Sequence, residues 1–168
     1  MLASLAALTL LAQTSAAAPP APPPPACASA DHHAFDFWVG KWTVTTKDGQ
    51  PAGDSLIESL YGGCVLRENW SQPGFAGGSL NILAEDGRWH QTWTDQSGAL
   101  REFVGGMEGG RMVLVAHVVS NRFNNRPALV RMTFTPNPDG SVRQYSDLSL
   151  DDGKTWTERY DFTYRRAA

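Results

Sequence analysis

Glu68 and Trp70 combine an acid and an aromatic ring at a spacing that indicates a site, because they lie two residues apart in an apolar run. On a β-strand such residues point to the same face. If that face lines the interior, Glu68 is a buried carboxylate that needs a partner, and Arg67 or Arg131 can supply one. A buried carboxylate with a raised pKa can act as an acid or base. A structural hydrogen bond or salt bridge is the commoner role.

A second pattern of this kind lies in residues 89–95, which read Trp-His-Gln-Thr-Trp-Thr-Asp. In a strand Gln91, Trp93 and Asp95 share one face with the first tryptophan. Two tryptophans beside polar groups can stack a planar or sugar ligand inside a cavity, and Tyr160 offers a further stacking surface. The alternative is that these rings pack in the core and the polar side chains lie at its rim.

The residue patterns of common catalytic and cofactor sites are missing from the sequence. It contains no Gly-x-Ser-x-Gly nucleophile motif, no phosphate-binding loop and no dinucleotide fingerprint. His32 and His33 adjoin Asp31 and would hold a metal only loosely, and His117 in an apolar run is expected to be structural. We therefore predict no catalytic residue, no metal site and no cofactor.

Charge and composition argue against a nucleic-acid partner and for one folded domain. The net charge is -3 and the basic residues are scattered, whereas phosphate binding needs a concentrated basic surface. The 168 residues are 42% hydrophobic and 18% charged, which is typical of a globular chain with a single core.

The elements that must position these side chains are short runs rich in Val, Thr, Leu and aromatic residues, separated by turn signals. Gly, Asn and Asp favour tight hairpin turns, and the runs suit pleated, half-buried strands. Residues 31–39 can form one short turn of helix, capped by Asp31. The predicted strands are 41–46, 55–60, 65–72, 79–84, 89–95, 100–105, 111–118, 128–135, 142–150 and 155–165.

Regularly spaced hairpins of this kind predict an all-β fold. Consecutive strands usually pair, and a meander removes its two unpaired edges by closing on itself. We therefore predict an antiparallel up-and-down barrel of about ten strands. A barrel of this size is either filled by side chains or holds one small ligand.

The opening of the predicted barrel, residues 35–42 (Phe-Asp-Phe-Trp-Val-Gly-Lys-Trp), resembles that of lipocalins. Lipocalin-type barrels begin with Gly-x-Trp, here Gly40 and Trp42, and an arginine from a late strand packs over that tryptophan. The resemblance implies that Arg165 or Arg166 makes this cation–π contact.

Nearly all of residues 27–166 resembles a family of exported bacterial proteins of unknown function, which is assigned a lipocalin-like or calycin-like barrel. The resemblance implies the fold and no particular activity. Besides the opening, it rests on Gly62-Gly63-Cys64, Glu68-Asn69-Trp70, Gly78-Ser79-Leu80-Asn81, residues 89–95 and residues 149–156.

Residues 149–156 also match the Asp-box of sialidase hairpins, Ser-x-Asp-x-Gly-x-Thr-Trp. In this motif Asp151 can accept hydrogen bonds from the turn amides, and Trp156 can pack beneath the turn. A sialidase propeller repeats the box several times, so a single copy predicts a hairpin staple rather than a catalytic element.

The N-terminus predicts export to the periplasm or the medium. Residues 1–18 are apolar, end in three alanines and are too short for a stable membrane span, so we predict a signal peptide there. Residues 19–30 form a Pro/Ala-rich linker, and residues 31–168 form a single β-barrel domain. In an oxidising compartment Cys27 and Cys64 are expected to pair, the alternative being two buried free thiols.

Three functions are compatible with this sequence. The first is the binding of a small apolar or amphipathic ligand in the barrel. The second is a small-molecule hydrolase or isomerase that uses Glu68 or Asp95 as an interior acid. The third is a packed barrel that acts on other proteins through its outer surface. For the first function the predicted ligand-binding residues are Glu68, Trp70, Gln91, Trp93, Arg131 and Tyr160.

Overall fold

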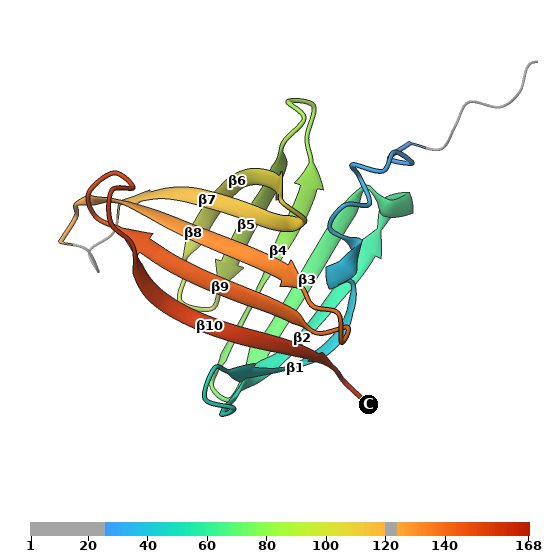
Figure 1. Cartoon of the computed structure of the whole chain (residues 1–168), viewed down its shortest axis with the longest axis horizontal. Coiled ribbons are helices and arrows are strands. Elements are labelled where there is room, and N and C mark those ends of the chain that lie inside the picture. Colours follow the sequence, from blue (N-terminus) through green and yellow to red (C-terminus); the bar gives the residue numbers. More distant parts are fainter. Residues whose placement is uncertain (1–25, 120–123) are drawn as a thin grey trace, which may run out of the picture.

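The computed structural model describes residues 26–119 and 124–168 of the chain. The predicted signal peptide and residues 19–25 of the predicted linker lie outside the described residues. Within the described ranges the chain forms ten antiparallel strands that close into a barrel, in which each strand pairs with its neighbours in sequence and the last pairs with the first (Figure 1). The predicted all-β, up-and-down barrel is confirmed.

The strands lie close to where the turn signals predicted them. They are β1 (Gly40–Thr46), β2 (Pro51–Leu60), β3 (Val65–Gln72), β4 (Phe75–Leu83), β5 (Trp89–Asp95), β6 (Leu100–Glu108), β7 (Arg111–Val119), β8 (Pro127–Pro136), β9 (Val142–Ser149) and β10 (Thr157–Arg166).

β4 begins at Phe75, directly after the predicted Pro73-Gly74 turn and four residues before the predicted strand start at Ser79. A Cβ atom on Gly77 would lie 2.6 Å from Cζ2 of Trp93 on the neighbouring strand. Glycine weakens a strand by itself, but here it allows a large side chain to lie against the backbone. A packing requirement across strands therefore explains the glycine inside β4.

The short helical turn predicted in residues 31–39 is a 3₁₀ helix, η1 (Asp36–Trp38), and a second, η2 (Tyr61–Gly63), follows β2. Phe35 occupies the N-cap of η1 and makes no side-chain cap hydrogen bond, so the predicted capping role of Asp31 is wrong. Asp36 is instead held by His33, whose Nδ1 lies 2.7 Å from its Oδ2. Burial of Phe35 and Trp38, rather than a side-chain cap hydrogen bond, therefore fixes this turn.

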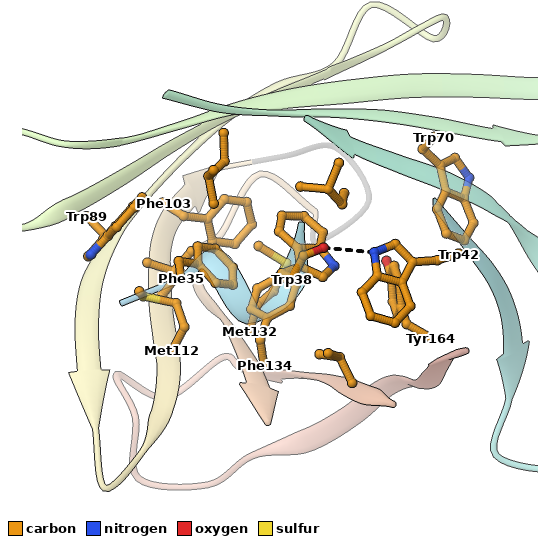
Figure 2. Packing of buried hydrophobic residues seen from close by; sticks show 14 of the residues in the cluster. Phe35, Trp38, Trp42, Trp70, Trp89, Phe103, Met112, Met132, Phe134 and Tyr164 are labelled. Carbon is orange, nitrogen blue, oxygen red and sulfur yellow. Dashed lines mark hydrogen bonds between the residues drawn. The ribbon is translucent and has the colours of Figure 1, made fainter. Parts of the chain in front are cut away.

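η1 fills the barrel end at which β1 begins and β10 ends, which we call the closed end. The side chains of Phe35 and Trp38 are fully buried and stack on each other with ring centroids 5.0 Å apart. Trp38 also packs on Phe134 of β8, at 4.8 Å. The indole nitrogen of Trp42 donates a hydrogen bond to the Trp38 carbonyl oxygen at 2.8 Å, the dashed line in Figure 2.

Arg166 covers this closed end from the last strand. Its guanidinium carbon lies 4.0 Å from the centre of the Trp42 ring, and its Nη1 donates a hydrogen bond to the Val39 carbonyl oxygen at 2.6 Å. Arg165 points elsewhere, 3.3 Å from Asp139. The predicted cation–π contact is therefore made by Arg166, and the barrel is consistent with a lipocalin-like fold.

A disulfide joins Cys27 to Cys64, as predicted. It ties the segment that precedes η1 to the turn between β2 and β3, across 37 residues of sequence. Disulfides persist in oxidising compartments, so this bond fits a periplasmic or extracellular protein. Within residues 26–119 and 124–168, no helix has the length and apolar character needed to cross a membrane.

The hairpin between β9 and β10 has the predicted Asp-box geometry. Asp151 accepts hydrogen bonds from Ser149 Oγ at 2.7 Å and from the amide and hydroxyl of Thr155 at 2.9 and 2.6 Å. The Trp156 indole donates to the Gly153 carbonyl oxygen at 3.0 Å. These bonds, that from the Thr155 hydroxyl foremost, lower the pKa of Asp151 to about 2. The motif closes a hairpin on the outer wall.

Replacement of Gly40 should open the seam between the first and last strands. Its φ is +143°, and a Cβ there would lie 1.8 Å from Nη1 of Arg166, so Gly40→Ala must displace that side chain. We expect a loss of about 2 kcal/mol in the free energy of unfolding, from backbone strain and the lost stacking. Chemical denaturation measures it.

The matched control is Gly49→Ala in the β1–β2 turn. Gly49 also has a positive φ, +77°, but nothing lies within 4 Å of its added Cβ. Its substitution reports backbone strain without the contact to Arg166. Equal destabilisation by both substitutions would contradict a special role for Arg166 packing.

Candidate functional site

A cavity of about 260 Å³ occupies the barrel interior at the end opposite η1, which we call the open end. It is small beside the roughly 300–1,000 Å³ usual for small-molecule sites, so it limits the ligand to a compact molecule. We call it the lumen cavity. Its walls are Glu68, Trp70, Gln72, Phe75, Gln91, Trp93, Asp95, Ser97, Arg101, Phe103, Met132, Gln144, Arg159, Tyr160, Phe162 and Tyr164.

Nearly parallel aromatic rings form one wall of the lumen cavity. Trp70 of β3 stacks on Phe162 of β10 with centroids 5.9 Å apart and an interplanar angle of 12°. Phe162 in turn stacks on Tyr160 at 4.6 Å and 19°. β3 and β10 are not neighbours in the sheet, so this stack crosses the interior. Flat apolar surfaces of this kind favour planar or extended apolar groups.

A chain of buried polar side chains runs across the floor to Glu68. The Gln91 amide donates to Asn81 Oδ1 at 2.7 Å, and Asn81 donates to Ser79 Oγ at 3.0 Å. Ser79 then donates to Glu68 Oε2 at 3.0 Å, and Ser55 donates to Glu68 Oε1 at 3.2 Å. Strands β2 to β5 each place one or two of these residues inward, so adjacent strands hold the carboxyl group in one orientation.

Burial raises the pKa of Glu68 to about 7, and the hydrogen bonds from Ser79 and Ser55 only partly offset that effect. Two hydroxyl donors are weaker compensation than an arginine would be. Near neutral pH the carboxyl group is therefore divided between its acid and its anion. As an acid it can donate a hydrogen bond to whatever occupies the lumen cavity.

Two tyrosines of β10 add polar groups to the lining. The Tyr164 hydroxyl donates to Gln144 Oε1 at 2.7 Å, and the Gln144 amide donates to the Tyr160 oxygen at 3.4 Å. Burial raises the pKa of Tyr160 to about 12 and that of Tyr164 well above its ordinary value. Both phenols therefore stay neutral near neutral pH, and their hydroxyl groups serve as hydrogen-bonding groups.

Charged and polar residues surround the mouth of the lumen cavity, which we define as Gln72, Asp95, Ser97, Arg101 and Arg159. Asp95 accepts hydrogen bonds from the Trp93 indole at 3.0 Å and from the Ser97 amide at 2.9 Å. Burial alone would raise the pKa of Asp95, but these bonds outweigh it and lower the pKa. Asp95 is thus an anion held by its own turn and a poor candidate for the interior acid.

Most of the residues predicted to bind a ligand lie together. Trp70, Gln91, Trp93 and Tyr160 line the lumen cavity with Glu68, although their contact with a ligand stays a prediction.

Arg131 lies elsewhere, and its predicted place beside Glu68 is wrong. On β8 the side chains of Val130 and Met132 point inward, so Arg131 points outward. There it donates to both carboxylate oxygens of Asp147, at 3.0 and 2.6 Å. Arg67 also points outward and pairs with Glu58 at 2.6 Å. Neither arginine reaches the interior.

Arg101 and Arg159 are the charged lining residues that sequence analysis missed. Arg101 pairs in register with Trp93, so the alternation of β6 could have placed it inside. Arg159 lies where the β9–β10 register shifts, between Glu158 and Tyr160. Strict alternation fails at such a bulge, so no sequence pattern could have placed Arg159.

Other parts of the described structure offer weaker sites. Two hollows of about 530 and 600 Å³ lie on the outer wall along β6, β7 and β8, but no buried polar side chain lines them. Among residues 26–119 and 124–168, no three His, Cys, Asp or Glu side chains gather as a metal site would require. The sequence matches no protein-family model and no curated protein.

Substitution of Glu68 by Gln should change how stability depends on pH. The folded state retains the Glu68 proton up to about pH 7, whereas the unfolded chain releases it near the ordinary value of 4.5. Stability from this group is therefore full below pH 4.5 and declines as the pH rises to 7, by roughly 3 kcal/mol in all. Glu68→Gln removes this decline.

Denaturant unfolding from pH 4 to pH 8 tests this expectation. Relative to the unmodified protein, the Glu68→Gln variant should gain stability between pH 4.5 and 7 and keep a constant difference above pH 7. Glu85→Gln is the matched control, because Glu85 is exposed in the β4–β5 turn. A difference independent of pH would show that the Glu68 proton is not held by folding.

Proposed function

We propose that this protein binds one compact, largely aromatic or amphipathic molecule in the lumen cavity. The observation that carries the proposal is the coincidence of an unfilled interior with flat aromatic walls and a polar floor at the same end of the barrel. A barrel packed throughout would have no such space. Small-molecule sites typically combine an apolar lining with a few convergent polar groups.

The arrangement of the lining supports both affinity and orientation. The Trp70, Phe162 and Tyr160 rings offer a stacked face, and Trp93 lies on β5 with its indole fixed by Asp95. Such rings bury a large area at little conformational cost. Beneath them, Glu68 presents a carboxyl group that both serines already orient, so a ligand hydroxyl, amine or carbonyl can bond there without reorganisation.

The proposed setting is the periplasm or the extracellular medium, as a carrier or receptor for this molecule. The Cys27–Cys64 disulfide supports an oxidising location. The Gly40, Trp42 and Arg166 arrangement supports a barrel of the lipocalin-like kind, in which an interior cavity is the usual functional element.

A hydrolase or isomerase is the second candidate, and the raised pKa of Glu68 favours it. A carboxyl group that titrates near pH 7 in an aromatic cavity has the right protonation equilibrium for general acid–base work. Within the described residues Asp95 is the other carboxylate on the lining, and its lowered pKa makes it no acid partner. Turnover of any bound compound that survived Glu68→Gln unchanged would exclude this role.

A fluorescence titration with N-phenyl-1-naphthylamine tests the binding proposal. This uncharged probe emits more strongly in apolar surroundings, and we expect saturable binding with one molecule per chain. Trp93→Leu should weaken the affinity by about tenfold, because a stacked ring contributes about 0.5–1.5 kcal/mol beyond its buried area.

Trp156→Leu is the matched control. Trp156 packs against Arg131 on the outer wall, with the guanidinium carbon 3.9 Å from its ring, so its loss should leave the probe affinity unchanged. Absence of saturable binding, or equal effects of the two substitutions, would refute a ligand site in the lumen cavity.

A further inference from the structure

Two arginines converge on the mouth of the lumen cavity from opposite sides of the opening. Arg101 enters from β6 and Arg159 from the bulge of β10, and both line the cavity. The Arg159 guanidinium carbon lies 5.7 Å from the Tyr160 ring centre, and its Nη1 lies 3.5 Å from Ser146 Oγ. Burial raises the pKa of Tyr160, and the positive charges of Arg159 and Arg101 both oppose that rise.

Asp95 is the one acid among the five residues of the mouth, which include both arginines. Asp95 Oδ2 lies 3.8 Å from Arg101 Nη1, which is beyond hydrogen-bonding distance. That same oxygen already accepts the Trp93 indole proton, and the other oxygen serves the Ser97 amide and hydroxyl. The N–H donors of Arg101 are therefore not hydrogen-bonded to Asp95, although the two side chains form an ion pair.

We infer that the ligand of the lumen cavity is an organic anion, whose carboxylate or similar group lies at the mouth between Arg101 and Arg159 while its apolar body stacks on the aromatic wall. The inference rests on the proposed function and names the chemical class of its ligand. Guanidinium groups bind carboxylates through paired, charge-assisted hydrogen bonds, which are stronger than neutral ones.

The opposite ends of the cavity fix the direction of the ligand. The floor carries Glu68, whose anion would repel a second carboxylate at close range. The mouth carries the cations. The anionic group therefore points outward and the apolar body inward.

Competition between two nearly isosteric compounds tests this inference on the full chain near neutral pH. 2-Naphthoate and 2-naphthamide have the same rings and similar shape, but only the first is charged. Each displaces bound N-phenyl-1-naphthylamine, so one readout serves both. We expect 2-naphthoate to bind at least about tenfold more tightly, the effect of one or two charge-assisted hydrogen bonds.

Substitution of the two arginines locates the effect. Arg101→Gln and Arg159→Gln should each reduce the preference for 2-naphthoate by about fivefold or more and leave 2-naphthamide binding within about twofold. Arg67→Gln is the matched control, because Arg67 pairs with Glu58 on the outer face of β3 and should leave the preference intact.

A salt titration of the unsubstituted protein keeps the test decisive if a variant does not fold. Raising the ionic strength from about 0.01 to about 1 M shortens the Debye length from about 30 to about 3 Å and should weaken 2-naphthoate binding selectively. Equal affinity for acid and amide, with the uncharged probe still bound, would overturn the inference and leave the proposed function standing. If the uncharged probe does not bind either, both fail.

Discussion

The contact between Arg166 and Trp42 joins the two ends of the strand order, and the rest of the structure depends on it. Trp42 and Arg166 are register partners across β1 and β10, so the contact lies on the seam where the sheet meets itself. Without that seam β1 and β10 would each present an unpaired edge. The hydrogen bond from Arg166 to Val39 extends the same fastening to the residue that links η1 to β1.

Closure at this seam also explains why the barrel is filled at one end and hollow at the other. The segment that precedes η1 lies at the closed end. Phe35 and Trp38 therefore enter the interior there, beside Trp42 and Phe134. No comparable segment crosses the open end in the described residues, where strands join through turns. The inward side chains there are left to form a lining, and polar residues such as Glu68 and Gln91 can be held without displacing a packed core.

The fold was largely predictable from local sequence, and the site only in part. Turn residues mark nearly every hairpin, and alternation placed Glu68, Trp70 and Trp93 on inward faces. The error at Arg131 was avoidable, because Val130, Met132 and Phe134 are the apolar set on that strand. The inward position of Arg159 was not predictable, because a bulge shifts the register of β10 there. The start of β4 was not predictable either, because the Trp93 side chain requires the glycine at position 77. Both depend on contacts between strands, which a single strand does not encode.

The disulfide adds a kinetic property to the closed end. Cys27 lies eight residues before Phe35, and Cys64 lies in the turn between β2 and β3. If η1 leaves its place, the tether keeps it at a high effective concentration beside its own vacancy. Return is then an intramolecular step that does not depend on the concentration of the protein. The closed end is thereby kept filled, and the lumen cavity opens at the opposite end of the barrel.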